Sequence, residues 1–313
     1  MRTTRVSNLL RNTKARRPRR ARTSERSKRG GTLIVGDGDI HAGSSIAICP
    51  PEGMVHDDGG QYLPSAQQIW LYEVREHCLR TVQKLIRDIK PAQVVYALNG
   101  DLTDGNHHYT HQLITPLESF HVRVAYALLE HSFDLIRPDV IHATRGTPAH
   151  VGKGGSLEEG LMRVLREEAL WPVAQDPDTK QATSYYRRYR VEGKVVDQKH
   201  HGRQGQRAHT RSAYARWYAQ DIELEHKRSG DIPPFLALRA HNHLLGDSGR
   251  DIDSLVRVIT GGCWQLATEW SYRSSFESLP SIGMYAVHVA PDGFDRLYPL
   301  AITPERPTLV EHS

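Results

Sequence analysis

The sequence predicts a protein of the α/β class, in which strands and helices alternate along the chain. Short apolar runs at 32–35, 94–98 and 140–144 have the length of buried strands, and a loop containing Gly follows each run. The segments between these runs repeat apolar side chains at spacings of three and four, as amphipathic helices do. The order strand, helix, strand, helix, strand indicates parallel βαβ units.

Three helices are expected in the first half of the chain. The first covers 65–88, with Ser65 as its N-terminal cap and Pro91 ending it. Its apolar stripe consists of Leu71, Val74, Cys78, Val82 and Leu85. The second helix repeats the same spacing at Leu117, Phe120, Val124 and Leu128. The third is expected near 157–169.

The remainder of the chain is richer in strands. Residues 184–191 and 194–196 flank Glu192 and Gly193, which predicts a β-hairpin. A helix between 212 and 227 is followed by four expected strands, at 235–239, 255–260, 284–289 and 294–298. Pro299 is expected to end the last of them. The sequence shows no repeat of fixed period and no second domain boundary, so residues 31–313 are expected to form one domain.

Charge divides the chain at residue 30. Residues 1–30 contain twelve basic residues and one Glu, whereas residues 31–313 contain 29 basic and 35 acidic residues. Because the first segment has almost no large apolar side chains, we expect a disordered basic tail. Its run at 14–22 would attract phosphate polyanions, nucleic acid above all. A solvated tail, an organellar transit peptide or a misassigned start codon would give the same charge.

Cysteine content and hydropathy exclude two further classes of protein. Cys49, Cys78 and Cys263 are far apart and form no CxxC or CxxH pattern, so a disulfide-stapled secreted domain is excluded. No apolar run reaches the ~18 residues needed to span a bilayer, and the N-terminus has no apolar signal-peptide core. A soluble, cytoplasmic protein without a membrane partner is expected.

Carboxylate and imidazole side chains follow four of the predicted strands, at the point where each strand ends. They are Asp39, His41, Asp101, His200, His201, His241 and His243. In α/β sheets the carboxyl ends of the strands line a common crevice, so these loops could converge there. Carboxylates mixed with imidazoles, and without thiolates, suit Mn, Fe, Zn or Ni.

The order of these motifs resembles the calcineurin-like metallophosphoesterase superfamily. Asp-x-His, Gly-Asp-x-x-Asp-Gly, Gly-x-x-x-His, His-His-Gly and His-x-His follow one another between residues 31 and 245. Each motif alone is more often surface polarity than a ligand, and only the set is specific. The resemblance implies a two-sheet β-sandwich flanked by helices. The pairing of Gly-Asp-x-x-Asp-Gly with Arg-Gly-Thr-x-x-His is similar to phage and prophage members.

The resemblance also implies a site for two divalent metal ions, with Mn²⁺ as first choice and Fe, Zn or Ni as alternatives. The residues it assigns as ligands are Asp39, His41, Asp101, His200, His241 and His243. The ligands of the first ion would be Asp39, His41 and His243. Asp101 would bridge both ions, and His200 and His241 would hold the second. His201 is the alternative to His200, because the sequence does not say which ring points inward.

One motif departs from the family pattern. The family has Gly-Asn-His-Asp or Gly-Asn-His-Glu after the third strand, whereas 145–150 reads Arg-Gly-Thr-Pro-Ala-His. Thr147 could supply a weaker oxygen ligand, and His150 could be a ligand or the acid for the leaving group. Arg145 could hold a phosphate oxygen by a forked contact, or could be only a surface charge.

A second segment also looks like the missing motif. Residues 105–108 read Gly-Asn-His-His, but they come four residues after Asp101 instead of after a strand of their own. We therefore favour 145–150 for that role. His107 and His108 are expected to line the substrate side or simply to begin a polar helix.

Together these patterns predict a metal-dependent phosphoesterase in which a dinuclear-metal-activated water hydrolyses a phosphate ester. The residues assigned to catalysis are Asp101, Arg145 and His150. The basic tail and the Pro/Gly/Asp-rich loop at 50–64 favour nucleic acid as substrate, and so a phosphodiesterase or nuclease. Two alternatives stay open: a phosphomonoesterase for a small phosphate or nucleotide, and a catalytically weak nucleic-acid-binding protein on the same fold.

Overall fold

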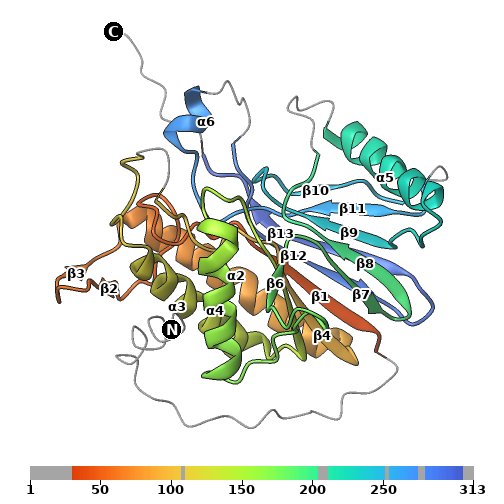
Figure 1. The fold of residues 1–313 in the computed structure, drawn as a ribbon, viewed down its shortest axis with the longest axis horizontal. Coiled ribbons are helices and arrows are strands. Elements are labelled where there is room, and N and C mark those ends of the chain that lie inside the picture. Colours follow the sequence, from red (N-terminus) through yellow and green to blue (C-terminus); the bar gives the residue numbers. More distant parts are fainter. Residues whose placement is uncertain (1–29, 107–109, 204–210, 251–253, 274–278, 306–313) are drawn as a thin grey trace.

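Two β-sheets packed face to face form the centre of the protein, and helices cover their outer faces (Figure 1). The computed structural model describes residues 30–106, 110–203, 211–250, 254–273 and 279–305. Of the expected disordered tail, only Gly30 falls within these ranges. The α/β class and the two-sheet sandwich expected from the sequence are confirmed by this architecture.

The larger sheet has six strands, and four neighbouring strands in it are parallel. The strand order is β13 (Asp295–Ile302), β12 (Ile282–Val289), β1 (Thr32–Asp37), β4 (Gln93–Leu98), β5 (Val140–Thr144) and β6 (Thr183–Ser184). β1, β4, β5 and β6 run parallel, as βαβ units require, whereas β12 and β13 are antiparallel to their neighbours. The four parallel strands therefore end at one edge of the sheet.

The smaller sheet has five strands. Their order is β10 (Gly246–Asp247), β11 (Arg257–Thr260), β9 (Leu236–Arg239), β8 (Lys194–Gln198) and β7 (Arg187–Val191). β8, β9 and β11 are parallel, and β7 and β8 form the predicted hairpin. Its turn residues Glu192 and Gly193 have φ of 48° and 75°, as a tight two-residue hairpin turn requires.

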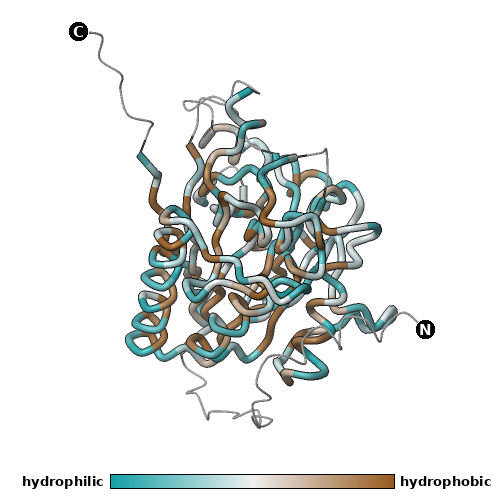
Figure 2. The backbone as a smooth tube through the Cα atoms, turned by 90° about the vertical axis from the view of Figure 1, so that its left-hand side faces the viewer, coloured by the Kyte–Doolittle hydropathy of each residue, from teal (hydrophilic) through white to brown (hydrophobic). Residues whose placement is uncertain are grey.

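Alternation of side chains along the strands builds a separate core on each side of the larger sheet. In β1, Leu33 and Val35 pack in the core shared with the helices, whereas Ile34 packs in the core between the sheets. On the far side of the smaller sheet, Ala237 packs beneath α5 (Arg211–Arg228), together with Ala219 of that helix. Figure 2 shows apolar residues along the inner side of the helices and hydrophilic residues on the outward turns.

Three helices cover the larger sheet: α2 (Ala66–Ile89), α3 (Glu118–Ile136) and α4 (Ser156–Glu167). Ser65 caps α2 as predicted, because its hydroxyl accepts from the Gln68 N–H while the Gln68 side chain returns to the Ser65 N–H. Five short elements have no counterpart among those expected from the sequence: β2 (Met54–Val55), β3 (Gln61–Tyr62), η1 (Lys153–Gly155), β10 and α6 (Glu269–Arg273).

Two expected boundaries are wrong. The strand expected at 184–191 is divided, because Ser184 belongs to β6 of the larger sheet and β7 of the smaller sheet starts at Arg187. Pro299 does not end the last strand, which continues to Ile302 with Pro299 opposite Tyr285. β13 is an edge strand of the larger sheet, and its outer side faces no neighbouring strand. A proline, which has no N–H to donate, is therefore tolerated there.

Within the described ranges, no helix has the length and apolar character needed to cross a membrane. The three cysteines, Cys49, Cys78 and Cys263, are buried and unpaired.

Candidate metal centre

The expected site residues come together where parallel strands of both sheets end. Backbone hydrogen bonds join the loops that carry them: the Asp39 N–H donates to the Gly100 carbonyl (2.9 Å), and the His41 N–H to the Asp101 carbonyl (2.9 Å). In the smaller sheet the Ala240 N–H donates to the His200 carbonyl (2.9 Å). The loops after β1, β4, β8 and β9 are thus fixed by their own backbone, before any ligand binds.

Backbone conformation marks the same residues. Ten non-glycine residues of the described chain have positive φ, and five of them are Asp39, His41, Asp101, His241 and His243. Side chains other than glycine pay about 1–3 kcal/mol to hold this conformation, and such strain clusters at functional sites. Glycine would remove the strain, so carboxylate and imidazole at these positions indicate a use for the side chain.

The first cluster consists of Asp39, His41 and His243, whose ligand atoms lie within 4.8 Å of one another. The Nδ1 of His41 contacts Asp104 Oδ1 at 3.0 Å. A carboxylate only accepts, so the His41 proton sits on Nδ1 and its Nε2 presents a lone pair. That Nε2 faces the Nε2 of His243 at 3.0 Å. The contact is favourable only with a proton or a cation between the two nitrogens.

The second cluster repeats this arrangement around Asp101, His200 and Asp39. The Nδ1 of His200 donates to the Asn99 carbonyl at 2.5 Å, so in the neutral ring its Nε2 is an acceptor. This Nε2 lies 2.9 Å from Asp101 Oδ2. Two acceptors at this distance again require a proton or a cation between them.

Asp39 Oδ1 lies between the two clusters. It is 4.0 Å from the Nε2 of His41, 3.8 Å from that of His243 and 4.0 Å from that of His200. The atom is buried and has no hydrogen-bond partner among the described residues, whereas the other oxygen, Oδ2, accepts from the His241 N–H at 3.0 Å. A buried carboxylate oxygen with three imidazole nitrogens about it has the surroundings of a metal ligand.

Electrostatics of the site follow from this crowding. Burial raises the pKa of Asp39 to about 7, with Asp101 adding to the effect. Burial also opposes the charge on Asp101, but the contact with His200 holds its pKa well below its usual value. His200 responds in the opposite sense: although burial lowers its pKa, Asp101 raises it to about 10. Without a cation, a proton on His200 supplies the positive charge that the two carboxylates need.

Thr147 lies on the second cluster. Its N–H donates to Asp101 Oδ1 at 2.6 Å, and its hydroxyl is 3.1 Å from Asp101 Oδ2. The same hydroxyl is 3.3 Å from the His200 Nε2 and 3.2 Å from the His241 Nδ1. The preceding Gly146 makes this approach possible, since a Cβ there would lie 2.0 Å from Asp101 Oδ1.

His150 lies beside the first cluster. Its ring contacts that of His41 edge-on, with 4.7 Å between the centroids. Its Nδ1 donates to the Asp104 carbonyl at 2.8 Å, so Nε2 is the nitrogen that can gain or lose a proton. Burial, followed by the nearby His41, lowers the pKa of His150.

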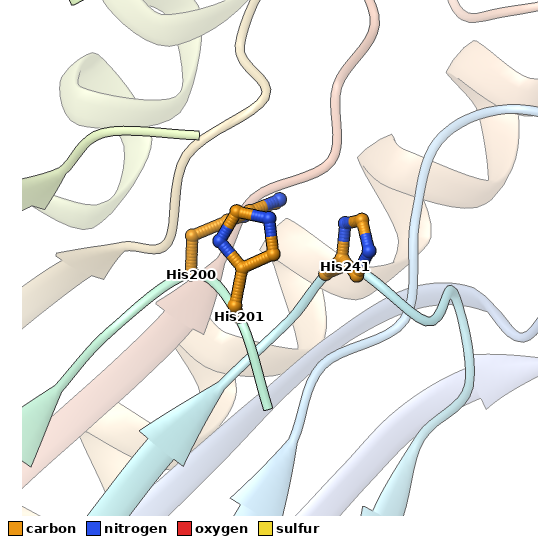
Figure 3. A group of neighbouring side chains, drawn as sticks. All are labelled: His200, His201 and His241. Carbon is orange, nitrogen blue, oxygen red and sulfur yellow. The ribbon is translucent and has the colours of Figure 1, made fainter. Parts of the chain in front are cut away.

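Of the adjacent pair His200 and His201, it is His200 that points inward. His200 is 1% exposed, whereas His201 is exposed and lies against His241, with 4.4 Å between the ring centroids (Figure 3). The sequence could not separate these two rings.

Arg145 is placed differently from the expectation that it holds a phosphate oxygen. Its guanidinium donates to the Thr183 hydroxyl (3.0 Å) and to the Gln181 side chain (2.8 Å), and it lies 3.8 Å from Glu159. These contacts direct it to the segment leading into β6, and they give it a structural role. His107 and His108 lie outside the described residues.

Two residues of the site were missed by the sequence analysis. Asp104 was quoted only as part of Gly-Asp-x-x-Asp-Gly, yet its carboxylate sets the His41 proton. Glu158 is fully buried, and its two oxygens accept from the N–H groups of Leu102 and Gly146, which follow Asp101 and Arg145. Asp104 could have been identified as the second Asp of that motif. Glu158 lies in the first turn of a helix and has no such signal in the sequence.

The donor set fits divalent cations. Two nitrogen ligands held tetrahedrally at ~2.0–2.1 Å from an ion lie roughly 3.4 Å apart, close to the spacings found in both clusters. A cation in each cluster would replace the contacts between facing acceptors and would satisfy Asp39 Oδ1. The arrangement could therefore hold two cations that share the carboxylates of Asp39 and Asp101.

Comparison with known proteins gives similarities of low identity. No protein-family model matches the sequence, and no curated protein does. An archaeal phosphodiesterase structure is similar at 12% identity and a TM-score of 0.35, covering 86% of this chain and 99% of that chain. Vps29 complexed with Zn²⁺ from Entamoeba histolytica gives 7% identity and a TM-score of 0.36, with coverages of 87% and 98%. A 5'-nucleotidase precursor from Thermus thermophilus gives 13% identity and a TM-score of 0.35, covering 87% of this chain and 55% of that chain.

Proposed function

We propose that this chain is a metal-dependent phosphoesterase that holds two divalent cations, one in each of the two clusters. The observation that carries the proposal is the buried Asp39 Oδ1, which accepts no hydrogen bond from the described residues and lies 3.8–4.0 Å from three imidazole nitrogens. The order of the motifs, which resembles the calcineurin-like superfamily, supports the same function. When bound, such a pair of cations neutralises phosphoryl oxygens and lowers the pKa of the attacking water.

The chain's own residues hold the reacting groups in place. Asp101, which the resemblance assigns to both cations, is held in place because Thr147 fixes its Oδ1 while its Oδ2 faces His200. Asp104 holds the His41 ring so that the His41 Nε2 faces the first cluster. We assign His150 to proton transfer at the leaving oxygen, since its Nδ1 donates to the Asp104 backbone carbonyl and Nε2 is the nitrogen that can exchange a proton.

For the substrate we propose a phosphodiester, nucleic acid above all. The local charge of residues 1–30, with twelve basic residues against one Glu, supports a polyanionic partner, because each neutralised phosphate releases counterions. A phosphomonoesterase acting on a small phosphate or nucleotide is the next substrate class. We propose a soluble, cytoplasmic setting for either activity.

A second candidate is a catalytically weak protein that binds nucleic acid on the same fold. Thr147 favours it, because its hydroxyl is a weak metal ligand and already lies within hydrogen-bond distance of Asp101, His200 and His241. In that case metal content would be below two per chain and no ester would turn over.

The test is hydrolysis of bis-p-nitrophenyl phosphate and p-nitrophenyl phosphate by metal-stripped protein resupplied with Mn²⁺ or Zn²⁺. We expect metal-dependent turnover that favours the diester. Asp101→Asn should abolish it while the protein stays folded, and Asp57→Asn, at an ion pair with Arg123, should leave it unchanged. Turnover of neither ester with any metal would favour the binding protein.

Removal of residues 1–30 separates the substrate classes. We expect the shortened chain to bind single- or double-stranded oligonucleotides more weakly and with a flatter salt dependence, while it hydrolyses the small chromogenic ester at the original rate. Equal losses in both assays would contradict a nucleic-acid role for the tail.

A further inference from the structure

Three imidazoles gather beside the second cluster, with His200 common to both groups, and one of them has no role in the function proposed above. His200, His201 and His241 lie at the ends of the neighbouring strands β8 and β9 (Figure 3). One ring nitrogen from each lies within 4.8 Å of the other two. Their ring centroids are 4.9, 5.2 and 4.4 Å apart. A third nitrogen donor therefore lies close to the two that already face Asp101 and Thr147.

The backbone of His201 is held close to His241, although its ring is exposed. The Asn242 side chain donates to the Gly202 carbonyl at 3.2 Å, and the Ala240 N–H donates to the His200 carbonyl. A Cβ on Gly202 would lie 2.8 Å from the Cβ of Arg239, so this segment is pressed against β9. His201 thus has a fixed base and an exposed ring that can turn at little cost.

Donor chemistry differs between the two clusters. At the second one, the Thr147 hydroxyl can donate its single proton to Asp101, and a neutral hydroxyl is a poor metal ligand. Apart from Asp39 Oδ1, which lies between the two clusters, that leaves one carboxylate oxygen from Asp101 and the imidazoles of His200 and His241. Tetrahedral zinc takes four ligands, and imidazole suits zinc whereas carboxylate and water suit manganese.

We propose that His201 is a third imidazole ligand of the second position, so that three nitrogens and one Asp101 oxygen make it a zinc-selective site. The inference deepens the proposed function, on whose two-cation site it rests. With four protein ligands besides the shared Asp39, the second cluster should bind its cation more tightly than the first cluster and fill first. The first position, with Asp39, His41 and His243, keeps room for exchange.

Cobalt binding reads out coordination at His201 directly. In His201→Cys, a thiolate replaces the imidazole, and Co²⁺ should produce a sulfur-to-cobalt charge-transfer band that is lacking in the wild-type protein, whose three cysteines are buried. We expect this band to develop with the first equivalent of Co²⁺. If no such band forms while Co²⁺ still binds the variant, His201 is not a ligand.

Zinc affinity gives the second readout, on apo-protein titrated with a competing chelator. His201→Ala should weaken the tighter site on the order of 100-fold, since even an outer partner of a ligand is worth 10–100-fold. Mn²⁺ affinity should change little. His131→Ala removes an imidazole that pairs with Glu76 instead, and serves as the matched control. Unchanged zinc affinity in His201→Ala would overturn the inference.

The two proposals fail in distinguishable ways. If the wild-type protein hydrolyses esters but the His201 variants bind metal as before, only the ligand assignment is wrong. If the His201 variants lose zinc while the wild-type protein turns over no ester, the metal site stands and the phosphoesterase function is wrong. Thermal unfolding of the apo-variants establishes that each is folded.

Discussion

Which nitrogen of each histidine carries the proton decides what this site can bind. Asp104 holds the His41 proton on Nδ1, and the Asn99 carbonyl does the same for His200, so both Nε2 atoms face the clusters as acceptors. The Asn99 contact uses a backbone carbonyl and does not depend on the side chain. The Asp104 contact does depend on the side chain, so a substitution at Asp104 can test it.

Asp104→Asn should weaken metal binding without unfolding the protein. The amide keeps the shape of the carboxylate but loses its charge, and it can turn its N–H₂ toward His41 and so move the proton to Nε2. We expect a 10- to 100-fold loss in metal affinity and turnover, the range usual for outer partners of metal ligands. Isothermal titration with Zn²⁺ and ester hydrolysis measure it. Metal binding equal to that of Asp57→Asn would contradict the role of Asp104.

His142 should make the fold sensitive to acid. Its ring stacks on Tyr189 with 3.9 Å between centroids, and its buried Nδ1 has no hydrogen-bond partner in the described part of the chain. Burial, followed by Arg187, lowers the pKa of His142 to about 3. The unfolded chain binds this proton below pH ~6.5, so the stabilisation present above that pH is lost as pH falls toward 3. From pH 7 to 5 the loss is at most about 2 kcal/mol.

Urea unfolding at pH 7 and pH 5 in the presence of a chelator measures this loss. His142→Gln cannot titrate, so its unfolding free energy should fall less between the two pH values than that of the wild-type protein. An identical fall in both proteins would show that His142 does not carry the effect.

At the scale of elements, helix α4 ties two of the site loops together. Glu158 accepts the Leu102 N–H at 3.0 Å and the Gly146 N–H at 2.9 Å, and so fixes the distance between Asp101 and Thr147. The next residue, Glu159, makes similar bonds to Ala182 and Thr183 at β6, away from the two clusters. Glu158 and Glu159 therefore offer a matched test, because they make similar hydrogen bonds to different loops.

Glu158→Gln should lower the unfolding free energy by about 1–3 kcal/mol, because the amide N–H₂ then faces a buried backbone N–H. It should also weaken metal binding, since the Asp101 and Thr147 loops are no longer held together. Glu159→Gln should cost comparable stability but leave metal binding unchanged. Chemical denaturation and zinc titration of both variants measure the two effects. Equal metal affinity in the two variants would contradict a positioning role for Glu158.

Sequence patterns predicted the elements better than the directions of side chains. Periodicity located the buried strands and the helices, because alternation and the 3.6-residue repeat reflect burial directly. Pro299 was misread because its effect depends on whether a strand lies at an edge. The partners of Arg145 could not be predicted, because nothing in its neighbours along the chain reveals Gln181 and Thr183, which bind it.

At the scale of the whole molecule, the strand-end rule brought the candidate ligands together. Asp39, His41 and Asp101 follow parallel strands of one sheet, and His200 and His241 follow parallel strands of the other. The two sheets stack, so both sets meet at one end of the sandwich. The rule could not show Asp104 or Glu158, whose roles depend on hydrogen bonds across loops rather than on a position after a strand.

Because both sheets contribute ligands, bound metal should stabilise the entire sandwich. Without cations, the negative charges of the buried Asp39 and Asp101 are balanced by protons. An ion that binds only the folded state adds about 2.7 kcal/mol to the free energy of unfolding when its concentration is 100 times its dissociation constant. For a domain of this size we expect the melting temperature to rise by roughly 5 °C when Zn²⁺ or Mn²⁺ is added to stripped protein. Asp101→Asn, which removes the shared carboxylate, should abolish most of the rise. A wild-type melting temperature indifferent to metal and chelator would mean that protons alone balance the two carboxylates, and that the site does not hold metal.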